Sequence, residues 1–311
     1  MIAQAIAALR KGELVGLPTE TVYGLAADAR NEAAILKVFA AKGRPSDHPL
    51  IVHIGTLAEL DQWACDIPQV ARRLAEHFWP GPLTLILKKA ASVSPLITGG
   101  QDTIAVRMPN HPLALKLLQE YGGALVAPSA NRFGCISPTD EHAVKAELAD
   151  QIACILPGGR TPVGIESTIL DVHTHPFTLL RQGMLKQSTL ETFLKEKIAL
   201  PSTKTTLRAP GLLASHYAPH TPLYLLPFAD LHMHTFASAI VLARQPAPPG
   251  LSPQTKWWLM PQDPDAYAYE LYATLRRADE AGVTAILVET TPAEPAWQAI
   301  CDRLTRASHR T

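Results

Sequence analysis

Apolar residues recur along the first two thirds of the chain at two different spacings. Where they return every three or four positions, one face of a helix is indicated, which predicts helices over 2–10, 31–41, 57–65, 68–77, 113–120 and 141–148. Short apolar runs bounded by turn residues predict strands over 14–17, 50–54, 83–87, 103–107, 124–127, 153–156, 167–171 and 177–180. Helices and strands do not alternate strictly, so we expect an α+β domain with a large twisted sheet rather than a doubly wound one.

The pattern changes after residue 199. A stretch rich in Ser, Thr and Pro is typical of a linker. Beyond it, strands are expected over 223–226, 239–243, 257–260 and 285–289, and helices over 265–279 and 296–306. This alternation predicts a small Rossmann-like α/β domain with parallel strands. We therefore expect a catalytic domain over 1–200, a linker over 201–221 and a C-terminal domain over 222–311.

Composition narrows the class of protein. With 311 residues, 47% of them hydrophobic, the chain can bury two cores. The 28 basic and 28 acidic residues balance, whereas constitutive nucleic-acid binders carry a basic excess, so any RNA contact should be weak or local. The four cysteines are scattered, which argues against a zinc knuckle and for a reducing compartment. No run approaches the ~20 apolar residues that span a bilayer. We expect a cytoplasmic protein with no membrane contact.

Two segments near the N-terminus carry candidate chemistry. Pro18-Thr19-Glu20-Thr21-Val22-Tyr23-Gly24-Leu25 places hydroxyls and a carboxylate after a strand, although it also fits a strand-to-helix turn with a threonine cap. Lys42-Gly43-Arg44-Pro45 places two cations at the end of a helix. They fit anion binding, or cations that complement the helix dipole before a terminating glycine. We expect Arg44 to be accessible, so that its loss would spare folding.

Three later segments end strands in polar residues. Arg107 closes an apolar strand and either reaches solvent along its stem or binds an anion. Ala127-Pro128-Ser129-Ala130-Asn131 lets a ligand approach the backbone, or is an ordinary turn. Ser167 lies in Gly164-Ile165-Glu166-Ser167-Thr168, ahead of Arg181. Motifs for a phosphate loop, a dinucleotide fold, a zinc protease and a serine hydrolase are all absent. This set favours positioning and charge neutralisation over covalent catalysis.

Taken together and in this order, the segments resemble the threonylcarbamoyl-AMP synthase family. The resemblance rests on Thr-Glu-Thr-Val-Tyr-Gly-Leu, Lys-x-Arg-Pro-x-x-x-Pro-Leu and Pro-Ser-Ala-Asn. It covers about the first 200 residues through the YrdC-like domain, and the remainder resembles the longer, two-domain branch. The resemblance implies a YrdC-like twisted α/β sheet with a concave, positively charged face. It also implies that ATP, L-threonine and bicarbonate give threonylcarbamoyl-AMP and pyrophosphate, for the threonylcarbamoyladenosine modification of tRNA.

The resemblance further assigns roles to individual positions. Threonine or its carbamate would be held by Thr21, His53, Arg107, the backbone at Ala127 and Ser167. ATP would be held by Arg44, His48, Thr103, Ser129, Ser137, Arg181 and His216. The catalytic cations would be Lys42 and Arg44, which neutralise phosphate charge.

Cofactors and partners follow from the same resemblance. Mg²⁺ would arrive with ATP, and no protein-bound transition metal is expected. Contact with tRNA or a transferase complex would be weak. His48 stands where the family usually has Asn, and Gly211-Leu212-Leu213 lacks the basic residues that often precede the His-Tyr pair.

Two other functions compete with this one. A carbamoyl-AMP-forming hydrogenase-maturation factor uses a related domain, but such chains are longer and carry paired-cysteine zinc motifs. A module that binds double-stranded RNA or tRNA on a basic concave face would need a basic and aromatic stripe, which is missing. The linker is expected to act as a lid, because His216 and Tyr217 are unusual in a passive tether. The alternative is that they pin the C-terminal domain.

Overall fold

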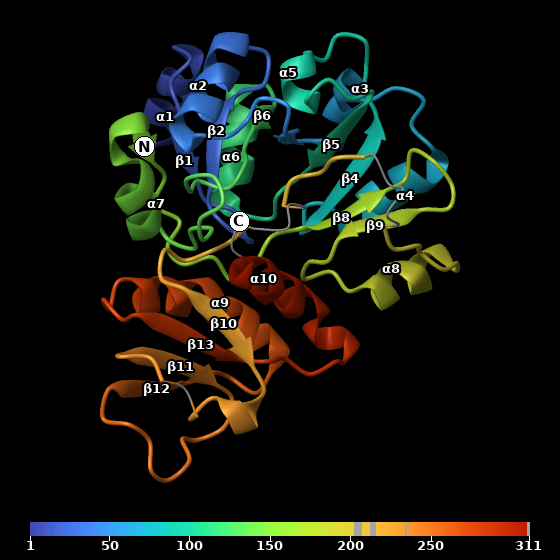
Figure 1. The fold of residues 1–311 in the computed structure, drawn as a ribbon. Coiled ribbons are helices and arrows are strands. Elements are labelled where there is room, and N and C mark those ends of the chain that lie inside the picture. The colour runs from blue at the N-terminus through green and yellow to red at the C-terminus, as the bar shows by residue number, and fades with distance from the viewer. Residues whose placement is uncertain (202–206, 212–215, 234, 310–311) are drawn as a thin grey trace. The chain divides into compact units, whose positions relative to one another are not determined.

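The computed structural model describes residues 1–201, 207–211, 216–233 and 235–309. They form two compact units (Figure 1), one made of 1–133 and 138–212 and the other of 134–137 and 213–311. Each unit has its own sheet and is described by itself. Among the described residues no helix is both long and apolar enough to cross a membrane.

The first unit is built on a nine-stranded mixed sheet, in the order β7-β1-β2-β6-β3-β5-β4-β8-β9. Its strands are β1 (Val15–Leu17), β2 (Gly24–Asp28), β3 (Ile51–His53), β4 (Leu83–Lys88), β5 (Thr103–Arg107), β6 (Leu125–Val126), β7 (Cys154–Ile155), β8 (Thr168–Asp171) and β9 (Thr178–Arg181). Parallel and antiparallel pairs both occur, for example β3 with β5 and β4 with β5. The predicted α+β class with a large twisted sheet is confirmed.

Helices pack against this sheet in the first unit. They are α1 (Ile2–Arg10), α2 (Glu32–Lys42), α3 (Leu60–Trp63), α4 (Gln69–Phe78), α5 (Pro95–Thr98), α6 (Pro112–Tyr121), α7 (Glu141–Leu148) and α8 (Gln187–Leu194). Most boundaries lie within two residues of the predicted ones, and α5 and α8 were not predicted. Asn31 caps α2, since its side chain accepts a hydrogen bond from the Ala34 N–H, and Gly43 ends the helix at φ +61°.

The segment after β1 is not the strand-to-helix turn that was one alternative for it. It turns into β2, which pairs antiparallel with β1 so that Leu17 lies opposite Gly24. The Thr19 hydroxyl accepts hydrogen bonds from the N–H groups of Thr21 and Val22, at 3.2 and 3.3 Å, which closes a tight turn. A side chain that satisfies the backbone locally favours a turn over a helix start. The run of small residues from Gly24 to Asp28 concealed the strand.

Side chains alternate between the two faces of the sheet. Leu85 and Leu87 of β4 and Ile104 of β5 point to the large core, which α2, α3 and α4 cover. The intervening Ile86 and Ala105 point to the opposite face. The alternation follows from the two-residue period of a strand. It leaves every second position of these strands on a face that the large core does not use.

Helices α1 and α6 cover only part of that opposite face. Their apolar side chains pack on β1, β2 and β6, in a cluster that includes Leu117 and Leu125. His53 pairs with Leu125 across β3 and β6, so both lie on this face. Over β3, β4, β5, β8 and β9 the buried apolar cluster draws on strand residues and on Ala209 of the linker, with Leu207 beside it. The candidate site lies on this part of the sheet.

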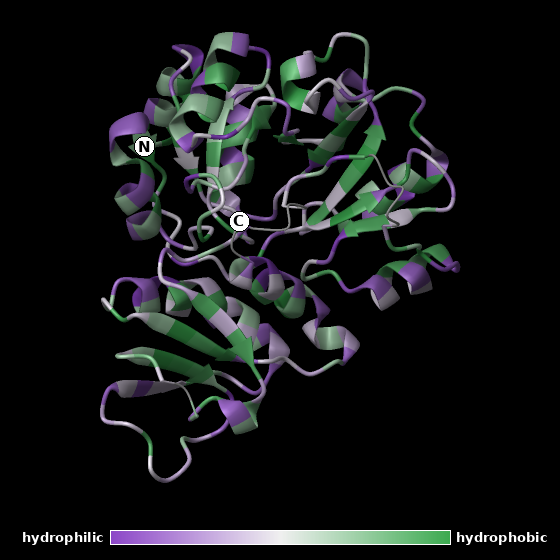
Figure 2. Ribbon diagram, viewed as in Figure 1, coloured by the Kyte–Doolittle hydropathy of each residue, from purple (hydrophilic) through white to green (hydrophobic). Residues whose placement is uncertain are grey.

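The second unit is a four-stranded parallel sheet in the order β10-β13-β11-β12. Its elements are β10 (Leu223–Leu226), β11 (Ala239–Ala243), β12 (Thr255–Leu259), β13 (Ala285–Glu289), α9 (Pro264–Asp279) and α10 (Gln298–Ser308). Figure 2 shows β11 and β13 as hydrophobic, and all their residues are buried. The predicted small α/β domain of parallel strands is confirmed.

Two features of the second unit involve aromatic residues. Tyr217 is 1% exposed, its ring is stacked 5.8 Å from Tyr272, and the Arg303 guanidinium lies 5.1 Å from its centre. This packing fits the pinning role that was one alternative for the His-Tyr pair.

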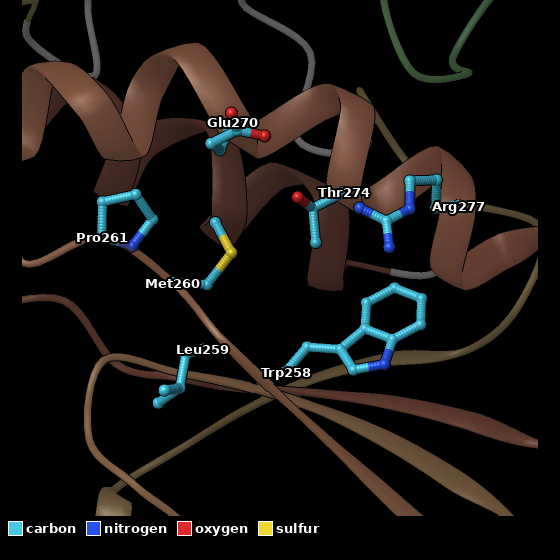
Figure 3. Close-up of a pocket in the computed structure, with 7 residues that line it drawn as sticks. All are labelled: Trp258, Leu259, Met260, Pro261, Glu270, Thr274 and Arg277. Atoms are coloured by element: carbon cyan, nitrogen blue, oxygen red, sulfur yellow. The ribbon is translucent and has the colours of Figure 1, made fainter.

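A pocket of about 550 Å³ lies where the edge strand β12 ends beside α9 (Figure 3), with Arg277 stacked over Trp258 at 4.9 Å. No predicted site residue lines this pocket.

Candidate active site

Polar side chains gather where β3 and β5 end. These strands are parallel and in register, with His53 beside Arg107. Both side chains are buried, at 2% and 4% exposure. Each terminates an apolar strand, so the fold places an imidazole and a guanidinium next to each other on the sheet face that α1 and α6 cover only in part.

The turn between β1 and β2 supplies the partners of Arg107. The Arg107 Nη1 donates to the Thr21 hydroxyl at 3.0 Å, and its Nε donates to the Gly81 carbonyl at 3.2 Å. The Nη2 forms an ion pair with the Glu20 carboxylate, at 2.6 Å. Thr21 in turn shares a hydrogen bond with Thr19 at 2.9 Å. The guanidinium is thus fixed from three sides, and its fork geometry cannot be supplied by lysine.

His53 is neutral in this environment. Burial, followed by the nearby charge of Arg107, lowers the pKa of His53 to about 3. Its Nδ1 lies 3.3 Å from the Ile51 carbonyl oxygen, which favours the tautomer with the proton on Nδ1 and leaves Nε2 as an acceptor. The Nε2 of His53 is therefore suited to accept a hydrogen bond from a hydroxyl or amine. Because its pKa is low, His53 is a weak base.

A second arginine lies on the same sheet through β4, β8 and β9. The Thr84 and Ser167 hydroxyls are 2.8 Å apart. Arg181 donates from Nη2 to the Ser167 hydroxyl and from Nε to the Ser167 carbonyl, both at 3.0 Å. Leu85, next to Thr84, pairs with Val106, which precedes Arg107. One row of polar groups thus connects the neighbourhoods of the two arginines.

Lys42 is buried, and its ammonium is engaged by the backbone. Its Nζ donates to the carbonyl of Ser129 and, at 2.5 Å, to that of Asn131. These carbonyls belong to the Pro-Ser-Ala-Asn loop, which also forms a bridge between Ser129 and Gly24. In this arrangement the lysine braces the loop, and its predicted role at the phosphates remains a prediction.

Arg44 is buried, contrary to the accessible position that we expected. It is 7% exposed, donates to the Pro49 carbonyl at 3.0 Å and lies 5.5 Å from the centre of the Phe133 ring. The sequence concealed this because Phe133 is distant along the chain. His48 meets the same ring edge-on at 5.3 Å, and burial together with Arg44 lowers the pKa of His48. A histidine in place of the usual asparagine therefore gains an aromatic contact.

The other predicted residues are spread more widely. Ala127 donates its N–H to the Ile51 carbonyl at 3.2 Å, beside the β3 end. Thr103 begins β5, four residues before Arg107, so about 13 Å separate them along the strand. Ser137 and His216 belong to the second unit. There the His216 N–H donates to the Arg306 carbonyl at 3.3 Å, and its ring lies 4.2 Å from that of Tyr217.

Residues 207–211 of the linker form a strap on the first unit (Figure 1, between the two grey traces). Ala209 packs in the cluster on the open sheet face, and the Pro210 carbonyl accepts from Arg181 Nη1 at 3.0 Å. Arg208 forms an ion pair with Asp47 at 3.0 Å and donates to the Gly99 carbonyl at 2.6 Å. Its backbone exchanges two hydrogen bonds with the Gln101 side chain, at 2.7 and 3.0 Å. Residues 202–206 and 212–215 lie outside the described part.

Sequence reasoning missed several polar residues of the site. Glu20 was quoted within a motif without a role, although it is the ion-pair partner of Arg107. Thr84 lies inside an apolar run, and only the alternation of faces indicates that it points away from Leu83 and Leu85. Gln101 carried no signal, because its partner is the linker backbone.

Comparisons with known proteins address the family. Residues 7–183 match the Sua5/YciO/YrdC family, described as "Telomere recombination", and residues 183–309 match the "Threonylcarbamoyl-AMP synthase, C-terminal domain" family. Together these matches span nearly the whole described chain. The chain belongs to the two-domain threonylcarbamoyl-AMP synthase family.

Relatives and solved structures agree with this assignment. The threonylcarbamoyl-AMP synthase of Pyrococcus abyssi is 38% identical over 311 residues, covering 96% of this chain and 92% of the relative. That of Bacillus subtilis is 38% identical over 320 residues, covering 99% and 92%. The crystal structure of P. abyssi Sua5 complexed with L-threonine superposes with a TM-score of 0.91 at 37% identity, covering 99% of this chain and 94% of that one.

The described residues were also considered as metal ligands. Within the described ranges, no group of three or more His, Cys, Asp or Glu side chains could hold a metal ion. The candidate site instead offers cations and hydroxyls, which suit carboxylate and phosphate groups.

We predict that His53 makes folding sensitive to acid. Below a pH of about 6.5 the unfolded chain protonates this histidine, whereas the folded chain does so only near pH 3. The free energy of unfolding should therefore fall as the pH is lowered through that window. Wild type should lose about 2 kcal/mol more than His53→Asn between about pH 7 and about pH 5 in urea titrations. The exposed His142, changed to Asn, is the control, and equal losses in wild type and His53→Asn would contradict the prediction.

Proposed function

We propose that this chain is an L-threonylcarbamoyladenylate synthase. It would convert ATP, L-threonine and bicarbonate into threonylcarbamoyl-AMP and pyrophosphate, for the threonylcarbamoyladenosine modification of tRNA. The relatives named above carry this activity in their names, and the observation that supports it best is the pair of buried arginines on one sheet face. Arg107 and Arg181 lie on the same row of polar groups, and Arg181 contacts the linker strap. An amino acid and a nucleotide each need an anion site, and these arginines supply one apiece.

The amino acid half of the site lies around Arg107. Its guanidinium would pair with the threonine carboxylate, and Thr21 and Ser167 would contribute hydroxyls. Neutral His53 would accept a hydrogen bond from the substrate without adding positive charge beside Arg107. The crystal structure of the P. abyssi relative contains L-threonine, which supports an amino acid site in this fold.

The nucleotide half lies around Arg181 and the loops at 44–48 and 128–131. Arg181 and Arg44 would stabilise charge that builds on the phosphates as the carbamate oxygen attacks the α-phosphorus and pyrophosphate leaves. Lys42 would hold Ser129 in place through the loop carbonyls. Thr103, Ser137, His48 and His216 are the other proposed nucleotide contacts. Mg²⁺ would neutralise phosphate charge when it enters with ATP.

The strap gives this chemistry a dry surface. It covers apolar residues of the sheet and contacts Arg181 directly. Excluding water protects a mixed anhydride that hydrolyses readily, which is a reason for a lid in such enzymes. We place the protein in the cytoplasm, where tRNA and a downstream transferase are available, with only weak contact to either.

The direct test is pyrophosphate release by purified protein given ATP. Release should require both threonine and bicarbonate, and omission of either should reduce it to background. A filter-binding assay on tRNA and duplex RNA serves as the comparison. Tight RNA binding without threonine-dependent pyrophosphate release would reject the proposed function in favour of an RNA-binding module.

We predict that Arg107→Lys impairs the use of threonine selectively. Lysine keeps the charge but loses the fixed fork that Thr21 and Gly81 hold. The KM for threonine should rise about 10-fold to 100-fold, because hydrogen bonds to charged groups are worth about 1.5–3 kcal/mol. The KM for ATP should change less than about threefold. An equal rise in both constants would place Arg107 on the nucleotide.

We predict that Arg208→Ala loosens the strap. The substitution removes the contacts to Asp47 and Gly99. Limited proteolysis within residues 201–221 should become several times faster, and ATP plus threonine should still suppress it. Arg72→Ala is a matched control, since Arg72 and Arg208 side chains are both 45% exposed and each pairs with one aspartate. Equal cleavage rates in all three proteins would mean that Arg208 does not hold the strap.

A further inference from the structure

Glu20 is a buried carboxylate that the chemistry described so far does not use. It is 5% exposed, and its Oε1 lies 2.6 Å from the Arg107 Nη2. Within the described part of the chain, neither Glu20 oxygen nor the Arg107 Nη2 makes a hydrogen bond of acceptable geometry. Burying a carboxylate is costly unless its oxygens are hydrogen-bonded. The charge is therefore compensated, but the acceptor capacity of the carboxylate is not.

The backbone aims Glu20 at this position. Its carbonyl accepts a hydrogen bond from the Val163 N–H at 2.9 Å, and the Thr19 hydroxyl holds the next two N–H groups. The turn thus presents Glu20 and Thr21 to the same guanidinium. Buried polar groups in native proteins nearly always have hydrogen-bond partners. The Glu20 oxygens, which the turn holds in place without such partners, therefore require an explanation.

A zwitterion would satisfy both members of the pair. An amino acid carries a carboxylate and an ammonium on one carbon, and the ammonium has three N–H donors. Arg107 is suited to the carboxylate and Glu20 to the ammonium. The Glu20 oxygens would then accept hydrogen bonds from the ammonium of the bound substrate.

The reaction also requires a proton acceptor at this place. An ammonium has no lone pair, so it must lose a proton before nitrogen can bond to carbon. His53 is a poor candidate, because burial and Arg107 lower its pKa to about 3. The hydroxyls of Thr19, Thr21 and Ser167 are not bases at neutral pH. Glu20 is a carboxylate, and it contacts Arg107, the residue proposed to bind the threonine carboxylate.

We propose that Glu20 binds the ammonium of L-threonine and takes the proton that must leave before the carbamate forms. This inference rests on the proposed function. The ammonium gives one proton to Glu20, and the freed lone pair forms the C–N bond with the carbon of bicarbonate. A C–O bond of bicarbonate breaks, and the departing hydroxide takes the proton from Glu20 and leaves as water. Glu20 is then a carboxylate again. A second N–H proton is lost to solvent, leaving the carbamate anion.

Among the described residues, Arg107 and His111 are the charged or titratable groups that interact with Glu20. Arg107 of β5 is its ion-pair partner. His111, at the start of α6, interacts electrostatically with Glu20, but burial lowers the pKa of His111 and keeps it neutral. His53 lies beside Arg107 and is also neutral, because burial and Arg107 lower its pKa to about 3. The pH dependence of the step should therefore follow the substrate ammonium.

The test compares wild type, Glu20→Gln and Glu141→Gln in threonine-dependent pyrophosphate release with saturating bicarbonate. Glutamine keeps the shape of Glu20 but is not a base. Near pH 7 the Glu20→Gln rate should be about 10²-fold lower or more, as for loss of a general base. The ratio of wild type to variant should shrink about tenfold per pH unit as the pH rises towards the pKa of the substrate ammonium. Glu141, which accepts from the Tyr23 hydroxyl at 3.2 Å, is a carboxylate control and should show neither effect.

The possible outcomes are distinct. A deficit of Glu20→Gln that stays constant with pH would mean that Glu20 only orients Arg107, and normal rates would mean that it has no role; either overturns the proposal. If Glu20→Gln does not fold, Glu20→Asp is measured in its place. A lower rate with the wild-type pH profile then supports the proposal. A deficit that shrinks as the pH rises rejects it. Absence of threonine-dependent release from wild type would instead reject the proposed function itself.

Discussion

The alternation of side chains across the nine-stranded sheet is the constraint on which the candidate site depends. In β5, Ile104 and Val106 enter the large core, so Ala105 and Arg107 must point the other way. A shift of one residue in register would bury the guanidinium in the large core and expose the apolar residues. The core therefore fixes the site. The same hydrophobic packing that stabilises the first unit selects which polar side chains meet on its other face.

That arrangement requires the protein to bury charge. Arg107, Glu20, Arg181 and Lys42 are all less than a tenth exposed, and each such charge costs several kcal/mol to desolvate unless it is paired and hydrogen-bonded. Backbone carbonyls carry much of this burden, as with Lys42 and the Ser129 loop. The exceptions are the Glu20 oxygens and the Arg107 Nη2, which form an ion pair but make no hydrogen bond of acceptable geometry among the described residues. Incomplete satisfaction inside an otherwise well-connected network is typical of a place where a ligand completes the set.

The linker contacts both the open sheet face and one of the buried charges. Its strap residues bury Ala209 on the open sheet face and bring a backbone carbonyl to Arg181. The polar anchors of the strap, Asp47 and Gln101, lie in loops of the first unit. Of these contacts, the Arg208–Asp47 ion pair is exposed, and an exposed ion pair contributes little stability. In the proposed function, this segment would close over the reactants and later release the product.

The sequence by itself determined the class of fold, most helices and strands, the family and a set of candidate residues. It could do so because hydrophobic period and turn chemistry are local, and because the motifs lie at strand ends. Tertiary structure alone decided which side chains meet. Glu20 and Arg107 are far apart in the chain, and they meet because the sheet order β1-β2-β6-β3-β5 brings the β1–β2 turn to the end of β5. Arg44 looked accessible because its ring partner, Phe133, comes from a distant loop. Burial and pairing across a sheet are properties of the assembled fold, and a local pattern carries no record of them.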